Sequence, residues 1–332
     1  MIDAVTATRT PPRTAHPAQH PLDLSIIIVN WNAKALLRDC LRSIVATLDG
    51  LNTEIIVVDN ASTDGSAETI AQEFRRARLI ANDINRGFAA ANNQGMRIAQ
   101  GRYVLLMNPD TVVLDDVIPR ALEWAEHHSD VAVLGCQVMD GPSSVQRTCF
   151  RFPSPLTLAL WASGLGTLFP TARFTDYGAY GKWDRQCERE VDVVSGMFML
   201  VRREAIEAVG LMDEDYFMYT EEADWCHRFR DAGWRCAFAP VGRILHVDGG
   251  SKSTDQVATQ MYVEKQRSVL LFQKKHRGAG AWLAAKLLFI VGMLLRAAWW
   301  SARSISGGGQ ASRRKAARAA AALLAHLSGT TR

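Results

Sequence analysis

Glycine-rich nucleotide-binding motifs are missing from this 332-residue sequence. No G-x-G-x-x-G pattern follows its first predicted strand, and G-x-x-x-x-G-K-[ST] occurs nowhere in it. Dinucleotide-dependent oxidoreductases and P-loop enzymes are therefore disfavoured. A C-x-x-C pair is also absent from its cysteines, which are Cys40, Cys136, Cys149, Cys187, Cys226 and Cys236. A zinc site is therefore not expected, and the pattern favours reduced, partly buried thiols in a cytosolic protein.

One end of the chain lacks an apolar segment, and the other end lacks acidic residues. Residues 1–21 contain no apolar core, so they form no signal peptide, and we expect residues 1–22 to be disordered. From Lys265 to the C-terminus there is no Asp or Glu, whereas Lys, Arg, Trp, Leu and Ala recur. A segment that is both basic and apolar favours an anionic membrane surface as its partner, and not nucleic acid.

Four apolar runs organise the first third of the chain. They cover residues 24–29, 54–59, 78–82 and 103–107, and helical or helix-capping patterns follow the first three. Strands that alternate with helices predict an α/β fold with a parallel, right-handed, doubly wound sheet. Ligands of such sheets bind beyond the carboxyl ends of the strands. Polar residues end or follow every one of the four runs: Asn30, Asn32, Asp59, Asn82, Asn85, Asn108 and Asp110.

Several candidate site residues also have a purely structural interpretation. Asp110 could cap the helix that follows it, and taken alone that interpretation is as good as a binding site. Glu221 and Asp224 open a predicted helix, where the helix dipole favours acids. A lone histidine such as His246 is more often a satisfied core residue than a ligand. The agreement of all four strand ends, and the aromatic run at 216–219 before the acids, favour chemistry instead.

The rest of the chain continues the α/β pattern around a long irregular segment. A fifth strand is expected at 131–135. Residues 140–190, rich in Pro, Gly and aromatic residues, predict a long surface excursion over the site. After this segment we expect a strand at 191–201 that is kinked around Gly196, a helix at 203–209, and strands at 234–239 and from 244 onward.

Taken in this order, seven stretches resemble the family 2 glycosyltransferases. They are residues 25–32, 54–66, 85–88, 107–110, 195–196, 217–226 and 233–246. The resemblance covers roughly residues 24–250. Within the family the sequence is most similar to bacterial rhamnosyltransferases that act on polyprenyl-linked cell-wall or O-antigen precursors.

The resemblance implies a GT-A fold and an inverting transfer from a nucleotide-activated sugar, with a divalent metal, Mn²⁺ or Mg²⁺. Asp110 and His246 would bind the metal, and Asp59 would accept the N3–H of a pyrimidine. Glu222 matches the family's catalytic base. The acceptor side would comprise Glu221, Asp224 and Gly196, and the nucleotide-sugar side Asn30, Asn32, Asp59, Asn85, Gly87, Asn92, Asn108 and Asp110.

Two departures from the family pattern concern the site itself. The family's Asp-x-Asp signature is here Asn108-Pro109-Asp110, so metal binding depends more on Asp110 and His246. The usual Glu-Asp pair is Glu221-Glu222, which makes the base one methylene longer.

Residues 281–300 are the most hydrophobic stretch of the chain, and Lys286 and Arg296 interrupt them. A spanning helix needs about 20 apolar residues. At 100° per residue these two residues and Arg303 fall within roughly a 100° arc, opposite a broad apolar face. The pattern favours an interfacial helix, with core packing or a spanning helix as alternatives. Residues 254–276 predict a helix packed on the catalytic domain, and 307–332 a second anchor or a frayed end.

Three segments are therefore predicted. They are a disordered segment 1–22, a GT-A catalytic domain 23–252 with a nucleotide-sugar half (23–135) and an acceptor half (136–252), and a helical membrane-associating extension 253–332.

The expected activity is transfer of L-rhamnose from dTDP-rhamnose to a hydroxyl of a polyprenyl-diphosphate-linked or glycan acceptor. The enzyme would be peripheral, at the cytoplasmic face of the bacterial inner membrane. Because no residue identifies the sugar unambiguously, a UDP- or GDP-linked donor is an alternative. A nucleotide-sugar-binding scaffold without turnover is another.

Overall fold

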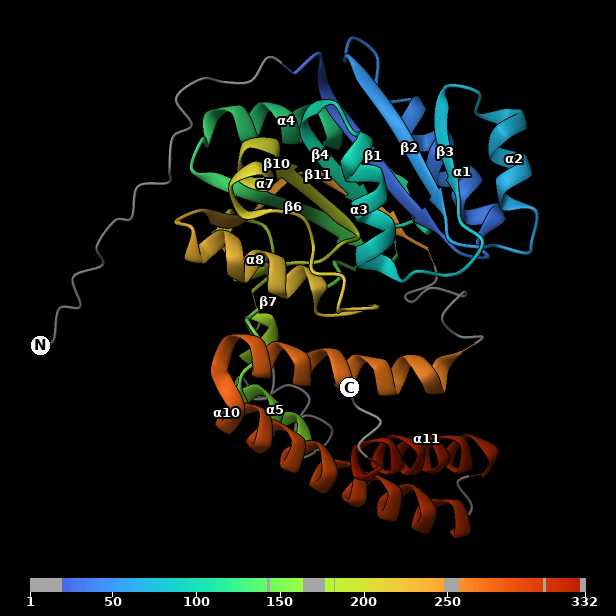
Figure 1. Cartoon of the computed structure of the whole chain (residues 1–332), viewed down its shortest axis with the longest axis vertical. Coiled ribbons are helices and arrows are strands. Elements are labelled where there is room, and N and C mark those ends of the chain that lie inside the picture. The colour runs from blue at the N-terminus through green and yellow to red at the C-terminus, as the bar shows by residue number, and fades with distance from the viewer. Residues whose placement is uncertain are drawn as a thin grey trace, which may run out of the picture.

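The computed structural model describes residues 20–141, 144–163, 177–181, 183–247, 257–306 and 309–328. Most of the predicted disordered segment 1–22 lies outside these ranges. In the described part, helices cover both faces of a nine-stranded sheet, and a helical extension packs below it (Figure 1).

The first four predicted strands are confirmed as parallel neighbours. β1 (Leu22–Asn30) lies between β2 (Thr53–Asp59) and β4 (Gly101–Met107), and β3 (Ala77–Ala81) flanks β2. All three strand pairs are parallel. The helices between these strands are α1 (Lys34–Val45), α2 (Ser66–Glu73) and α3 (Phe88–Ile98).

The second half of the sheet is mixed. β6 (Val131–Met139) runs parallel to β11 (Arg235–His246), whereas β10 (Phe198–Arg202) is antiparallel to both β4 and β6. Two short strands, β5 (Thr111–Val113) and β8 (Arg189–Glu190), pair antiparallel with β11. The order is β3-β2-β1-β4-β10-β6-β11-β5, with β8 also beside β11.

Successive residues of the strands lie alternately in two hydrophobic cores, one on each face of the sheet. In β1, Ile27 belongs to the core under α3, α7 (Arg203–Val209) and α8 (Glu221–Asp231), while Ile28 belongs to the core under α1, α2 and α4 (Val117–His127). This alternation follows from the two-residue period of a strand. Five of the six cysteines are buried in these cores, and none forms a disulfide.

The strand predicted at 191–201 is broken at Gly196, where a kink was expected, but the two parts belong to different sheets. β9 (Val193–Val194) pairs with β7 (Cys149–Phe150) in a separate two-stranded sheet, and β10 begins only after Gly196. The Gly196 N–H donates to Glu222 Oε1 at 3.1 Å instead of to a neighbouring strand. The break therefore brings the backbone to a candidate site residue.

Two further expectations need correction. The strands predicted at 234–239 and from 244 form one strand, β11, whose register with β6 shifts midway along it. The segment 140–190, predicted as irregular, contains the helix α5 (Pro155–Ala162) and a short 3₁₀ turn, η1 (Tyr177–Ala179). A capping box at Ser154 starts α5, and its apolar side chains pack on the C-terminal extension. Residues 142–143, 164–176 and 182 lie outside the described ranges.

The extension consists of α10 (Ala258–Ile305) and α11 (Gly309–Leu327). Gly278, with φ 80° and ψ 179°, breaks α10 into two halves. The first half packs on the catalytic domain, where Phe272 joins the core and Ser268 Oγ donates to a carbonyl of the loop before α8. The second half bends away and packs on α5 and α11 (Figure 1).

The second half of α10 is oriented differently from the prediction. Arg296, expected on the charged face of an interfacial helix, packs against the protein. Its guanidinium donates to the Trp161 carbonyl at 2.5 Å and lies 4.0 Å from the centroid of that indole ring, because this side of α10 packs on α5. Length and composition alone would allow α10 to cross a bilayer. Its opposite side is exposed and apolar, with Leu283, Leu287, Val291, Leu294, Leu295 and Trp299.

Candidate active site

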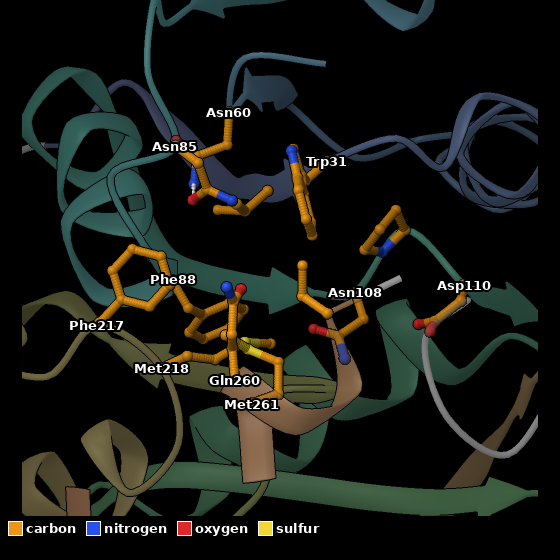
Figure 2. A pocket seen from close by; sticks show the side chains of 13 residues that line it. Trp31, Asn60, Asn85, Phe88, Asn108, Asp110, Phe217, Met218, Gln260 and Met261 are labelled. Carbon is orange, nitrogen blue, oxygen red and sulfur yellow. Dashed lines mark hydrogen bonds between the residues drawn. The ribbon is translucent and has the colours of Figure 1, made fainter. Parts of the chain in front are cut away.

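Two adjoining cavities open at the ends of the central strands. The first, of about 290 Å³, lies beyond the carboxyl ends of β1, β2 and β4, where ligands of such sheets bind (Figure 2). Its polar lining includes three of the predicted donor-binding residues, Asn85, Asn108 and Asp110. The other lining residues are Val29, Trp31, Asn60, Phe88, Pro109, Phe217, Met218, Val257, Gln260 and Met261.

Asn30, Asn32 and Asp59 do not line this cavity but join the turns that follow β1 and β2. Asp59 is buried, and its carboxylate accepts from Asn30 Nδ2 at 2.8 Å and from the Ser62 N–H at 3.0 Å. Asn32 Oδ1 accepts from the Thr63 N–H at 2.8 Å. Each oxygen of the Asp59 carboxylate can still accept another hydrogen bond. The hydrogen bond predicted between Asp59 and the N3–H of a pyrimidine therefore stays a prediction.

The turn before α3 is held by amide hydrogen bonds and by one obligatory glycine. Asn85 Oδ1 accepts from Asn60 Nδ2 at 2.8 Å and from the Gly87 N–H at 2.9 Å. Gly87 has φ +84°, and a Cβ there would lie 2.3 Å from the Phe217 carbonyl oxygen. Asn92 is buried and donates to a carbonyl in the first turn of α3. Gly87 and Asn92 thus shape the cavity without lining it.

Asp110 and His246, predicted as metal ligands, lie together at the edge of the first cavity. Asp110 Oδ2 and His246 Nε2 are 3.3 Å apart, and both side chains are buried. Asp110 Oδ1 is buried without a hydrogen-bond partner in the described part of the chain. His246 Nδ1 lies 3.1 Å from Gln146 Oε1, so an Nδ1–H donated to Gln146 leaves the Nε2 lone pair facing Asp110.

This pair fits a hard or borderline divalent cation, because it offers one carboxylate and one imidazole. Among the described residues, no group of three or more His, Cys, Asp or Glu side chains could hold a metal ion. Asp110 and His246 would be two protein ligands of such an ion, beside oxygens of substrate and water.

The second cavity, of about 420 Å³, contains the acidic pair. It shares Phe88, Asn108 and Met218 with the first cavity, and Gly196, Glu221 and Glu222 also line it. A Cβ at Gly196 would lie 2.9 Å from Phe88 Cζ and 3.2 Å from Glu222 Oε1. The absence of a side chain at Gly196, predicted on the acceptor side, therefore leaves space for Glu222 next to Phe88, which lines both cavities.

The two glutamates have different surroundings. Glu221 is 2% exposed, and burial together with the Glu222 charge raises the pKa of its carboxyl well above the ordinary value. Burial also raises the pKa of Glu222, although the Gly196 N–H and the Lys265 ammonium oppose that shift. Glu222 is partly exposed in the cavity. Glu221 therefore keeps its proton more readily, and Glu222 is the group placed to exchange one.

Backbone strain and a buried ion pair fix the helix that carries these acids. Tyr219 and Thr220, just before α8, have φ of 69° and 70°, which is a strained region for such side chains. Asp224 lines neither cavity. Its carboxylate accepts from Arg228 Nε at 2.9 Å and lies 2.7 Å from His276 Nε2 on α10. Asp224 thus ties α8 to the extension.

Sequence reasoning missed the contribution of α10 to both cavities. Gln260 and Met261 line the first cavity, and Lys265 lines the second. The family resemblance ends before them, so no signal pointed to them. Trp31 and Gln146 were also missed, although Trp31 stands between the two asparagines that follow the first strand.

Comparison with known proteins identifies the family to which this chain belongs. The family model described as Glycosyl transferase family 2 matches residues 25–210, more than half of the chain. The protein is therefore a glycosyltransferase. It belongs to glycosyl transferase family 2, and the predicted GT-A fold is confirmed.

Two characterised relatives cover most of the chain. The N-acetylglucosaminyl-diphospho-decaprenol L-rhamnosyltransferase of Mycobacterium tuberculosis is 28% identical over 237 residues, which cover 68% of this chain and 76% of that protein. The low-salt glycan biosynthesis hexosyltransferase Agl10 of Haloferax volcanii is 23% identical over 246 residues, or 73% of each chain.

Solved structures share the fold at lower identity. The mannosyltransferase PcManGT from Pyrobaculum calidifontis, in complex with GDP-Man and Mn²⁺, has a TM-score of 0.55 and 16% identity, covering 94% of this chain and 91% of its own. GalNAc-T7 with UDP, GalNAc and Mn²⁺ has a TM-score of 0.50 and 15% identity, covering 76% of this chain and 48% of its own.

Proposed function

We propose that this enzyme transfers a sugar, with inversion, from a nucleotide donor in the first cavity to an acceptor hydroxyl in the second. One observation carries the proposal. The cavity with Asp110 at its edge shares a wall with the cavity that holds Glu222. A donor and an acceptor bound side by side would therefore meet between a cation-binding pair and a carboxylate.

Glu222 would act as the general base. In the proposed step, its carboxylate takes the proton of the acceptor hydroxyl as that oxygen forms a bond to the anomeric carbon. The bond from that carbon to the donor diphosphate breaks on the opposite face, so the configuration inverts and a nucleoside diphosphate leaves. Burial of Glu222 strengthens it as a base, and Glu221, which keeps its proton, adds no second negative charge.

The donor would be held by the turns at the ends of β1, β2 and β4. Asn85 and Asn108 would contact it directly, and Asp59 would accept the N3–H of a pyrimidine base. Asn30, Asn32, Gly87 and Asn92 would hold these turns in place. Asp110 and His246 would bind a divalent cation, Mn²⁺ or Mg²⁺. That ion, when bound, would neutralise charge on the leaving diphosphate. The Mn²⁺ in both solved neighbours supports this assignment.

The finer proposal is transfer of L-rhamnose from dTDP-rhamnose to a polyprenyl-diphosphate-linked acceptor. The relative from Mycobacterium tuberculosis, whose name gives L-rhamnose as the sugar and a diphospho-decaprenol-linked acceptor, supports the sugar and the acceptor class. The exposed apolar face of α10 supports a peripheral position at the cytoplasmic face of a bacterial inner membrane, close to such an acceptor. The same fold with a UDP- or GDP-linked sugar is the alternative enzyme, and a scaffold without turnover is the non-enzymatic one.

A donor panel tests these proposals. The full-length protein is incubated with dTDP-rhamnose and with UDP- and GDP-linked sugars, each with and without Mn²⁺, and with an alkyl-diphosphate-linked N-acetylglucosamine as acceptor. We expect metal-dependent product from dTDP-rhamnose. Product from another donor alone would replace the rhamnosyl assignment, and binding without product from any donor would favour the scaffold.

A further inference from the structure

The second cavity contains two cations that the proposed mechanism does not use. Lys265, on the first half of α10, and Arg151, between β7 and α5, line it together with Glu221 and Glu222. The rest of its lining includes apolar side chains from several elements, namely Phe150, Pro153, Val193 and Val269.

Lys265 is available to a ligand. Its side chain is exposed, and it forms no ion pair within the described part of the chain. Its Nζ lies 5.9 Å from the centroid of the Tyr219 ring, which also lines the cavity. The neighbouring Glu264 pairs instead with Arg267 at 3.1 Å. No described carboxylate is therefore bonded to the Lys265 ammonium.

The first cavity differs in charge. The described residues that line it include no lysine and no arginine, and its charged group is the carboxylate of Asp110. A diphosphate there would depend on the cation held by Asp110 and His246. The second cavity, on the acceptor side, is instead lined by the cations Lys265 and Arg151.

A lysine near a general base lowers the basicity of that base. The positive charge favours the ionised form of Glu222 and so makes it a weaker proton acceptor. That arrangement is useful if the acceptor itself brings negative charge next to the hydroxyl that reacts. A sugar joined to a lipid through diphosphate does so, and lysine binds phosphate oxygens as a compact point charge.

We propose that Lys265 binds the diphosphate of a lipid-linked acceptor, so that the first half of α10 selects the acceptor. Arg151, whose guanidinium lies 4.7 Å from the centroid of the Tyr180 ring, adds a second positive charge to the same cavity. The apolar lining would contact the start of the lipid chain. The inference rests on the proposed function, which assigns this cavity to the acceptor.

Binding of decyl diphosphate tests the site without any sugar donor. Its affinity is measured by calorimetry with the full-length protein in saturating dTDP and Mg²⁺, so that the first cavity is occupied. Lys265→Ala should weaken binding by roughly tenfold or more, the loss expected for one charge-assisted hydrogen bond. Lys265→Arg should restore most of the affinity. Lys274→Ala, at an exposed lysine of the same helix that lines neither cavity, is the matched control.

The outcomes separate this site from the donor site and from the proposed reaction. Asp110→Asn should leave decyl diphosphate binding unchanged, because that residue belongs to the first cavity. Equal affinity in wild type and Lys265→Ala, or no binding by wild type, would overturn the inference even if sugar transfer is observed. Lys265-dependent binding in a protein that transfers no sugar would keep the diphosphate site and reject the proposed function.

A kinetic comparison adds a second readout. With an alkyl-diphosphate-linked sugar as acceptor, Lys265→Ala should raise KM with little change in kcat. With a neutral alkyl glycoside of the same sugar, both constants should stay near those of wild type. Equal losses on both acceptors would indicate that Lys265 only supports the structure of the cavity.

Discussion

The two halves of α10, which meet at Gly278, differ in their surroundings. The half before Gly278 faces inward, where Phe272 joins the main core and Gln260 and Lys265 line the cavities. The half after Gly278 leaves large apolar side chains such as Leu287 half exposed. The left-handed glycine turns the chain between them. The first half therefore forms part of the cavity walls, and in our proposal only the second half contacts a membrane.

Removal of divalent cations should have the largest effect on sugar transfer. It should act on the catalytic domain and not on the second half of α10. Excess chelator should abolish transfer, because without the ion Asp110 and His246 do not neutralise the negative charge of the departing diphosphate. Asp110→Asn should lose activity in the same way, whereas Asp116→Asn, at an exposed aspartate, should not. Transfer assays with Mn²⁺ or Mg²⁺ added back check the result. Undiminished transfer in chelator would remove the metal from the mechanism.

Substitution of the base comes next in size. Glu222→Gln should keep donor binding and lose transfer on the order of 10² to 10⁴-fold, the usual contribution of general-base catalysis. Because the pKa of Glu222 is raised, transfer by the wild-type enzyme should fall as the pH drops through a value above the ordinary glutamate range. A pH–rate profile checks this. If Glu221→Gln is inactive and Glu222→Gln nearly normal, the two roles are reversed.

A third prediction concerns the second half of α10. Replacing Leu287 and Leu294, each about half exposed, by serine should weaken binding to anionic vesicles by about tenfold or more, because each side chain would lose apolar burial in the bilayer interface. Val45→Ser, on an exposed position of α1, is the matched control. Vesicle co-sedimentation measures the effect. Unchanged sedimentation of the leucine variant would remove this face from the membrane proposal.

The smallest expected effect is on stability. The fold raises the pKa of Glu221 above its unfolded value, so the stability it contributes is present below the unfolded pKa and is lost as the pH rises through the folded pKa. Glu221→Gln should therefore raise Tm near neutral pH, by roughly 2–4 °C for each kcal/mol gained, and change it little near pH 4. Thermal unfolding at both pH values checks this. A lower Tm at neutral pH would contradict the buried, protonated state.

The parallel half of the fold could be predicted from the sequence, because short apolar runs and helical patterns alternate regularly along that part of the chain. Residues 24–29 and 103–107 fall inside β1 and β4, and the polar residues after them lie at one edge of the sheet. The kink around Gly196 was predicted, but the change of strand partners there was not, since it depends on distant segments: β9 pairs with β7, and the Gly196 N–H donates to Glu222 on α8.

The candidate site was predicted unevenly for a similar reason. Motif residues such as Asn108 and Asp110 are adjacent in sequence to the strand that positions them. Lys265 and Gln146 reach the site only through tertiary packing, so local periodicity carried no signal for them. The arc shared by Lys286, Arg296 and Arg303 could be predicted from helical spacing, but the packing of Arg296 on α5 could not, because a helical wheel shows angles and not neighbouring elements.

A paired transfer assay tests the division of α10 most directly. The wild-type enzyme, Glu222→Gln and the Leu287→Ser/Leu294→Ser variant are each given a vesicle-embedded polyprenyl-diphosphate-linked acceptor and a short-chain soluble analogue. Glu222→Gln should lose activity on both acceptors, whereas the leucine variant should lose it only on vesicles. A leucine variant that loses equal activity on both acceptors would contradict the separation of chemistry from membrane contact.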